Sequence, residues 1–269
     1  MSFSWHKYGD LVYLTSDLIA ATGLVKHGFS TRHGSVFGMS TDNFDLGFKN
    51  GEPKAVRAMR QLFLGTLGMS LNTLVAGQQV HGTRVAVVTE ADAGRGAMMW
   101  ENGLPGTDAL VTATADLPLS VYTADCVPLL FLDPVHKAVG AAHAGWRGSV
   151  NKIAVATLQA LQNNYGSRPK DVLVAIGPSI GPCCYEVDDK VLLPLKEQVL
   201  WWREVTMFSR PGHCKLDLWE LNRRLLLNAG ISKNHISLAR ICTRCCVQNF
   251  FSYRGEQGRA GSLMAVISL

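Results

Sequence analysis

The stretch ADCVPLLFLDPVHKAVGAAHAGWRG, residues 124–148, contains two apolar runs separated by a turn. Asp133 and Pro134 suit the first two positions of a type I β-turn, so residues 127–132 and 137–142 are predicted to form an antiparallel hairpin. With Pro134 and Val135 as the loop, Cys126 lies directly opposite His143. Opposed residues point to one face with Cβ atoms about 5 Å apart, which suits two ligands of one metal ion.

This pairing depends on the register of the hairpin. A slip of one residue would send the two side chains to opposite faces of the sheet, and a type I turn is not the favoured two-residue hairpin loop. A cysteine between apolar strands is also more often a core residue than a ligand. The residues alone therefore leave a structural role for Cys126 open.

Apolar periodicity on both sides of the hairpin predicts a mixture of helices and strands. Helices are expected at residues 53–69, 149–163, 188–201 and 217–228, with Ser149 capping the second. Further strands are expected at residues 83–89, 108–113, 119–123, 172–176, 235–241 and 262–269. This pattern predicts an α/β protein: a single-domain layered sandwich over residues 1–269, with mixed β-sheets flanked by helices.

Composition restricts the class of protein. The chain has 269 residues, of which 47% are hydrophobic and 17% charged, as in ordinary globular proteins. The net charge of +5 is scattered, so a nucleic-acid partner is not expected. No signal peptide and no apolar run of about 18 residues is present, so no membrane association is expected. The odd number of cysteines, seven, is interpreted as reduced thiols in a cytoplasmic protein.

A thiolate combined with imidazoles is a zinc-like ligand set that also suits copper. His81, in QQVHGTRV, is the candidate for a third ligand because it lies in a polar, glycine-flanked turn before a predicted strand. Three protein ligands leave a fourth position open, which is the pattern of a catalytic site. Asp125, beside Cys126, is a candidate for orienting a ligand or transferring a proton.

Short motifs run in order over nearly the whole chain: FSTR at 29–32, QVHG at 79–82, ADCVP at 124–128, HAGWRG at 143–148, IGPSI at 176–180, YEV at 185–187, CT at 242–243 and FFSYR at 250–254. In these motifs the chain resembles the laccase-domain family, also described as multicopper polyphenol oxidases or YfiH-type purine nucleoside phosphorylases. The resemblance implies a YfiH-like layered fold. It also implies a zinc ion bound by His81, Cys126 and His143.

The resemblance further implies phosphorolysis of adenosine, inosine and methylthioadenosine, together with deamination of adenosine. Other members are described as copper polyphenol oxidases, and one branch is linked to editing of peptidoglycan precursors. Two segments depart from the family pattern. Many members have two glycines where this chain has His33-Gly34-Ser35, and an asparagine where it has Asp45. These differences bear on substrate preference, so His33 and Asp45 are included among the expected substrate-binding residues.

Phosphorolysis needs an anion site. Residues 145–149 open a predicted helix whose free N–H groups would attract phosphate, and Arg147 and Arg32 would add bidentate donors. Arg147 could instead pair with a structural carboxylate. Phe251 and Tyr253 are candidates for stacking on a purine, with Arg254 beside them, although aromatic residues in an apolar run are more often core.

The function that the resemblance implies is zinc-dependent purine nucleoside phosphorolysis with adenosine deamination. One alternative is a copper polyphenol oxidase, against which count eight scattered histidines without paired HxH motifs. Another is a cysteine hydrolase or amidase with Cys126 as nucleophile and His143 as base. A purely structural metal is the non-enzymatic alternative.

A second cysteine motif lies near the C-terminal end of the chain. Cys242 and Cys245 have the CxxC spacing of a redox or zinc-ribbon motif. No second CxxC completes a ribbon, and Cys183 and Cys184 are interpreted as structural residues.

Overall fold

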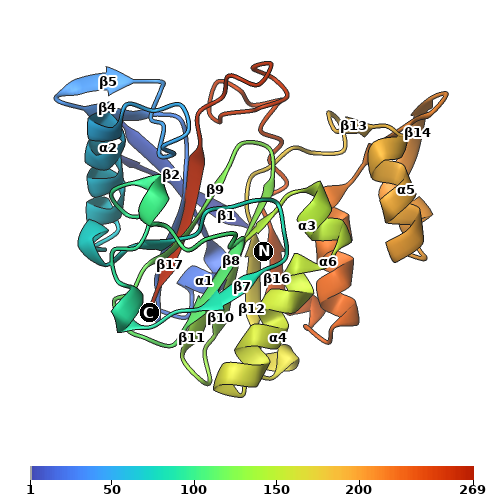
Figure 1. Ribbon diagram of the computed structural model, residues 1–269, viewed down its shortest axis with the longest axis horizontal. Coiled ribbons are helices and arrows are strands. Elements are labelled where there is room, and N and C mark those ends of the chain that lie inside the picture. The colour runs from blue at the N-terminus through green and yellow to red at the C-terminus, as the bar shows by residue number, and fades with distance from the viewer. Residues whose placement is uncertain (1) are drawn as a thin grey trace.

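The computed structural model describes residues 2–269 and contains two six-stranded β-sheets that pack face to face between helices (Figure 1). The strands of the first sheet, in spatial order, are β1 (Phe3–Tyr8), β2 (Leu11–Ser16), β3 (Lys26–Ser30), β17 (Leu263–Ser268), β9 (Leu119–Thr123) and β6 (Val75–Ala76). Those of the second sheet are β16 (Ile236–Leu238), β12 (Leu173–Ile176), β10 (Val127–Asp133), β11 (Ala138–Ala144), β8 (Ala109–Thr112) and β7 (Val85–Val87).

Smaller elements complete the chain. A three-stranded sheet has the spatial order β13 (Glu186–Val187), β15 (His213–Leu216) and β14 (Thr206–Arg210). A separate hairpin is formed by β4 (Gly34–Val36) and β5 (Met39–Thr41). The α-helices are α1 (Asp17–Ala20), α2 (Pro53–Thr66), α3 (Trp146–Val150), α4 (Ile153–Tyr165), α5 (Asp189–Gln198) and α6 (Leu218–Asn228). Each helix among residues 2–269 is too short or too polar to span a lipid bilayer. The predicted α/β class, with mixed sheets flanked by helices, is confirmed.

The central strand β10 is apolar throughout because both of its faces are covered. Leu129 and Phe131 face the helices on the outer side of the second sheet, whereas Leu130 and Leu132 face the first sheet. All four side chains are fully buried. Such double burial is the usual cause of a continuous apolar run in a strand, since neither face needs polar residues.

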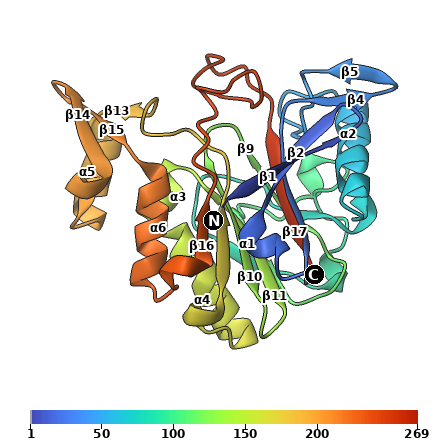
Figure 2. The same cartoon turned by 180° about the vertical axis from the view of Figure 1, so that it is seen from behind.

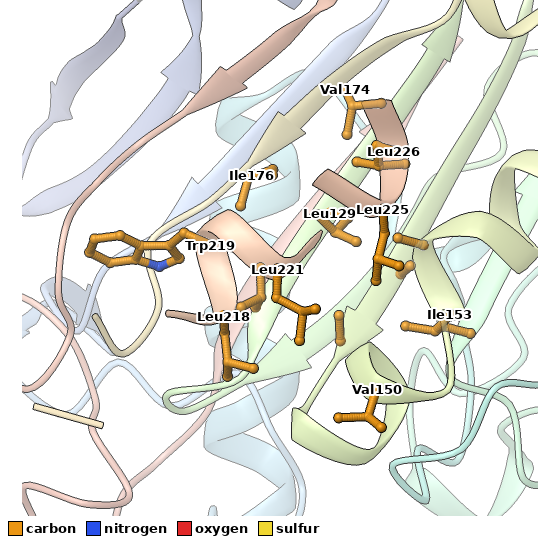
Figure 3. Packing of buried hydrophobic residues seen from close by; sticks show 14 of the residues in the cluster. Leu129, Val150, Ile153, Val174, Ile176, Leu218, Trp219, Leu221, Leu225 and Leu226 are labelled. Carbon is orange, nitrogen blue, oxygen red and sulfur yellow. The ribbon is translucent and has the colours of Figure 1, made fainter. Parts of the chain in front are cut away.

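Helices cover the outer face of each sheet. Helices α4 and α6 lie against the second sheet, and α2 lies against the first (Figures 1 and 2). In Figure 3, side chains of α6 pack beside strand residues of the second sheet. The labelled residues of this packing are Leu129, Val174, Ile176, Leu218, Trp219, Leu221, Leu225 and Leu226. The molecule therefore has four layers: α2, the first sheet, the second sheet, and α4 with α6.

The predicted register of the hairpin is wrong by two residues. His143 is paired with Pro128, not with Cys126, and the last ladder pair before the turn is Asp133 with Ala138. The loop therefore contains four residues instead of two. Because side chains alternate with a period of two, this shift leaves the side-chain faces unchanged. Cys126 lies just before β10 and still approaches His143.

The predicted helix at 149–163 is two helices. Lys152 has a φ of 65°, in the left-handed region, which ends α3 and sets a new direction for α4. Ser149 lies inside α3 rather than at an N-cap, and its hydroxyl instead accepts a hydrogen bond from Asn222 Nδ2 at 2.9 Å. Apolar spacing continues across this break, so periodicity alone could not locate it.

A buried histidine makes the stability of the fold depend on pH. Burial lowers the pKa of His27 to about 4, and its Nε2 accepts a hydrogen bond from Ser16 N at 2.9 Å. As the pH falls from about 6.5 to about 4, His27 therefore becomes protonated in the unfolded chain but stays neutral in the folded chain. Over that window, we expect His27 to reduce the free energy of unfolding by about 1.4 kcal/mol per pH unit.

Urea unfolding of the wild type and of His27→Gln at a series of pH values measures this effect. The difference in unfolding free energy between the two proteins is expected to be constant above pH ~6.5 and to shift in favour of the variant below it. Parallel pH profiles would contradict the prediction.

Candidate active site

The hydrogen bond between His143 and Asp108 follows from strand pairing. Ala142 of β11 pairs with Ala109 of β8, so His143 lies opposite Asp108. His143 Nδ1 donates to Asp108 Oδ1 at 2.8 Å, and both side chains are buried. The bond fixes the orientation of the imidazole and leaves Nε2 of His143 as the free ring nitrogen.

The same carboxylate orders the loop that carries His81. Backbone N–H groups of Val80, His81 and Gly82 donate to the Asp108 oxygens at 3.1, 2.9 and 2.8 Å. His81 has a φ of 62°, a conformation that residues other than glycine seldom adopt. Asp108 therefore stabilises a strained backbone and at the same time aligns the second histidine.

Two histidines and a cysteine converge at the open end of the hairpin. One side-chain donor atom from each of His81, Cys126 and His143 lies within 4.8 Å of the other two. The imidazole centroids are 4.7 Å apart with the rings at 79°. A Cβ added at Gly145 would lie 2.8 Å from His81 Cδ2 and 3.1 Å from Cys126 Sγ, so the close approach of this backbone requires glycine.

The electrostatics of this group favour a thiolate. Burial raises the pKa of Cys126, but the neighbouring His143 and His81 outweigh burial and lower it to about 6. Burial lowers the pKa of His143, but Cys126 and Asp108 outweigh it and raise the pKa to about 9. A thiolate and two imidazoles with converging donor atoms fit zinc or copper, both of which bind this ligand set.

The three residues line a cavity of about 910 Å³. Positively charged side chains outnumber carboxylates on its wall. The basic residues are Lys49, Arg60, Arg147, Lys190, Arg210 and Arg254, and the acidic ones are Asp125, Glu186 and Asp188. Aromatic side chains of Trp100, Tyr185 and Tyr253 also line it. Such a cavity is large enough for a small molecule and suits one that carries an anionic group.

Arg147 is exposed and lines the cavity without a carboxylate partner in the part of the chain that the structure describes. Its guanidinium lies 4.5 Å from the centroid of the Trp146 ring. Arg254 also lines the cavity, but its Nη1 donates to the backbone oxygen of Glu186 at 2.9 Å. Tyr253 is 55% exposed, so its ring is accessible from the cavity.

Asp125 lies beside the cluster, but both of its carboxylate oxygens already accept hydrogen bonds. Thr243 Oγ1 donates to Oδ1 at 2.6 Å, and the backbone N–H of Arg254 donates to Oδ2 at 2.6 Å. Its φ of 82° turns the chain sharply just before Cys126. These contacts suit Asp125 to a role in positioning Cys126.

The structure does not bring Arg32 or His33 to the cavity wall. Arg32 donates to the backbone oxygens of Asp42 and Val247 and forms an ion pair with Glu256 at 3.1 Å. The ring nitrogens of His33 contact Asp42 and Asn249. The bidentate donors of Arg32 thus bind loop backbone, a role that the sequence motif does not distinguish from phosphate binding.

Asp45 and Phe251 are also placed behind the cavity wall rather than on it. Asp45 accepts hydrogen bonds from the backbone N–H groups of Gly47 and Ser262, both of which line the cavity. Phe251 is 1% exposed and belongs to the core between the sheets. These two residues therefore lie behind the wall and support residues that line it.

Sequence reasoning missed Asp108 and Arg60. Asp108 opens an apolar strand, and a carboxylate at the start of such a strand is the signal that could have identified it. Arg60 is 2% exposed, donates to the backbone oxygens of Leu46, Gly96 and Ala97, and lies between two aromatic rings. Arg60 lies on the buried face of α2, and the sequence pattern does not predict that it binds loop backbone there.

Comparison with known proteins shows the family to which this chain belongs. Purine nucleoside phosphorylase YlmD of Geobacillus stearothermophilus is 39% identical over 246 residues, covering 89% of this chain and 88% of the relative. Adenosine deaminase RL5, from an unknown prokaryotic organism, is 35% identical over 189 residues, covering 70% and 72%. The crystal structure of hypothetical protein YfiH from Bacillus licheniformis superposes with a TM-score of 0.90 at 32% identity, covering 98% of each chain.

The solved structure of YlmD from Geobacillus stearothermophilus has a TM-score of 0.87 at 33% identity, also covering 98% of each chain. Residues 26–269 match the profile of a family described as Multi-copper polyphenol oxidoreductase laccase. These likenesses confirm the predicted resemblance and the YfiH-like fold. The chain therefore belongs to the laccase family that includes YfiH-type and YlmD-type proteins.

Proposed function

We propose that this protein is a zinc enzyme that phosphorolyses purine nucleosides and deaminates adenosine. The observation that carries the proposal is the convergence of His81, Cys126 and His143 on the wall of a cationic cavity of about 910 Å³. The names of the relatives, purine nucleoside phosphorylase and adenosine deaminase, support the same chemistry.

His81, Cys126 and His143 would hold the metal ion, with Nε2 of His143 facing it because Nδ1 is bonded to Asp108. When bound, the ion would supply Lewis-acid chemistry that activates water or polarises a substrate. Asp108 keeps both histidines aligned, and Asp125 positions Cys126. We therefore assign Asp125 to positioning rather than to proton transfer, because both of its oxygens already have donors.

Phosphorolysis breaks the bond between the purine nitrogen and ribose C1′ and forms a bond from C1′ to a phosphate oxygen, while the released purine takes up a proton. Arg147 is the proposed phosphate ligand because it lines the cavity without an ion-pair partner among residues 2–269. Burial raises the pKa of Tyr185. Its hydroxyl thus stays protonated and is available to donate a hydrogen bond in the cavity.

Deamination replaces the exocyclic amine of adenosine with an oxygen from water and releases ammonia. The exposed ring of Tyr253 is the proposed stacking surface for the purine, since base–aromatic stacking tolerates adenosine and inosine alike. Both reactions would then use one nucleoside site. They differ in whether phosphate or water is the nucleophile.

Incubation of the zinc-loaded protein with adenosine and phosphate tests the proposal directly. We expect adenine with ribose 1-phosphate, and inosine from deamination, separated by chromatography and identified by mass. Cys126→Ala should lower both activities to background and remove the metal from the cluster. Cys214→Ala, a cysteine replacement on β15 outside the cluster, is the matched control and should keep both activities. If the zinc-loaded wild type forms neither product, the proposal is refuted. If full activity appears only with copper, the active metal is copper instead of zinc.

The thiolate–imidazolium character of Cys126 and His143 favours one second candidate, a cysteine hydrolase that works without metal. The two candidates respond oppositely to a chelator. Removal of the metal should abolish the proposed reactions, whereas a cysteine hydrolase would keep its activity and lose it when iodoacetamide alkylates Cys126.

Asp108 is expected to tune the metal site. Asp108→Asn retains the shape of the side chain but removes the charge that His143 Nδ1 contacts, so metal affinity or activity should fall about 10- to 100-fold. Competition with a chelating dye measures the affinity. Asp133→Asn is the matched control, because Asp133 contacts His136 Nδ1 at 2.8 Å at the other end of the same hairpin. Equal losses of metal affinity in the two variants would contradict the prediction.

Arg147 is expected to affect one reaction and spare the other. Arg147→Gln removes a charge-assisted hydrogen bond, so the KM for phosphate should rise about 10- to 100-fold. Deamination uses no phosphate and should keep its rate. Arg210→Gln is the control, since Arg210 lines the same cavity but is already paired with Glu186 at 2.8 Å. A parallel loss of deamination in Arg147→Gln would show a general effect on the cavity instead.

A further inference from the structure

A second group of side chains that could hold a metal ion lies outside the cavity. Cys183, Cys184, Cys242 and Cys245 each place a sulfur within 4.8 Å of the others. The Sγ atoms of Cys183 and Cys184 are 3.5 and 3.4 Å from that of Cys245. Around a tetrahedral zinc ion with Zn–S bonds of about 2.3 Å, neighbouring sulfurs lie about 3.8 Å apart. The spacing therefore fits four ligands of one ion.

Two tight turns present these sulfurs to one another. In the first, the backbone N–H groups of Cys184 and Tyr185 both donate to the oxygen of Gly181 at 3.0 Å. In the second, the N–H of Cys246 donates to the oxygen of Cys242 at 3.0 Å. The N–H of Gly181 also donates to Cys242 Sγ at 3.2 Å, which stabilises negative charge on that sulfur.

The surroundings of the cluster suit a tetrathiolate complex. Four thiolates around a divalent ion carry a net charge of −2, and two cations lie at the rim. Lys215 Nζ donates to the backbone oxygen of Cys183 at 3.0 Å, and Arg244 Nη1 approaches that of Cys184 at 3.4 Å. The ligand set contains only sulfur, which selects zinc or iron over magnesium or calcium. Cys183 and Cys245 are exposed, so an ion has a path from solvent.

We propose that Cys183, Cys184, Cys242 and Cys245 form a second metal site, a structural Zn²⁺ centre separate from the one at His81, Cys126 and His143. Four protein ligands fill a tetrahedral ion and leave no open position, as in structural rather than catalytic zinc sites. The four cysteines, all within the described residues, do not line the cavity. The second ion therefore binds no substrate.

The position of this centre gives it a role in shaping the cavity. It joins the loop after β12 to the segment between β16 and β17. The first loop supplies Ile180 and Tyr185 to the cavity wall, and the second supplies Arg254. Both also hold Asp125: its backbone oxygen accepts from Ile180 N at 2.9 Å, and its carboxylate accepts from Thr243. The zinc thus fixes the two loops that support the residue preceding Cys126.

Metal counting on the purified full-length protein tests the inference without an activity assay. The count in Cys126→Ala reports on the four cysteines alone and is therefore independent of the proposed function. The wild type, loaded with Zn²⁺ under reducing conditions and desalted, should hold two equivalents per chain. Cys242→Ser with Cys245→Ser should hold one, as should Cys126→Ala, and the combined variant none. Cys246→Ser, next to the cluster in the chain but outside it, should keep two.

X-ray absorption of zinc in Cys126→Ala identifies the ligands, since only the second centre would remain loaded. A shell of sulfur alone at about 2.3 Å is expected. Nitrogen in that shell, or no zinc in Cys126→Ala, would overturn the proposal, as would a disulfide among the four cysteines in protein purified without reductant. If the double variant fails to fold, Cys183→Ser at an exposed position provides the same measurement.

Discussion

The carboxylate of Asp108 is the constraint on which the site depends. Its two oxygens accept hydrogen bonds from the imidazole of His143 and from three successive backbone N–H groups at residues 80–82. A buried carboxylate with several donors is stabilised as an anion, and the lowered pKa of Asp108 reflects that His143 and these N–H groups outweigh the opposing effect of burial. One side chain therefore joins a β-strand and a strained loop into a single rigid ligand frame.

That frame exists because the second sheet is buried on both faces. Strands β8, β10 and β11 are held in register by core packing, and their ends bring Asp108, Cys126 and His143 together. The apolar run that makes β10 recognisable in the sequence is thus also what gives Cys126 and His143 a fixed position. At the cavity end of the hairpin, Cys126 and His143 reach the cavity wall, whereas the apolar residues between the two ends of the hairpin are buried.

Much of this could be predicted from sequence, and the failures have physical causes. The hairpin and the approach of Cys126 to His143 followed from apolar runs around Asp133-Pro134. The register did not, because a four-residue loop and a two-residue loop share the same turn residues. Arg32 and Phe251 belong to family motifs, which do not separate residues that touch substrate from residues that support the wall. The cluster of four cysteines could not be predicted, because its two pairs lie about 60 residues apart in the sequence and meet only through tertiary packing.

The three-stranded sheet of β13, β14 and β15 and helix α5 extend to one side of the main sandwich in both views (Figures 1 and 2). Residues from this part of the chain, among them Val187, Lys190 and Arg210, line the cavity, whereas the histidine–cysteine cluster comes from the central sheet and the loop before it. Reactivity and selectivity are therefore encoded in different segments. Residues 186–216 can vary to admit other molecules while the histidine–cysteine cluster remains intact.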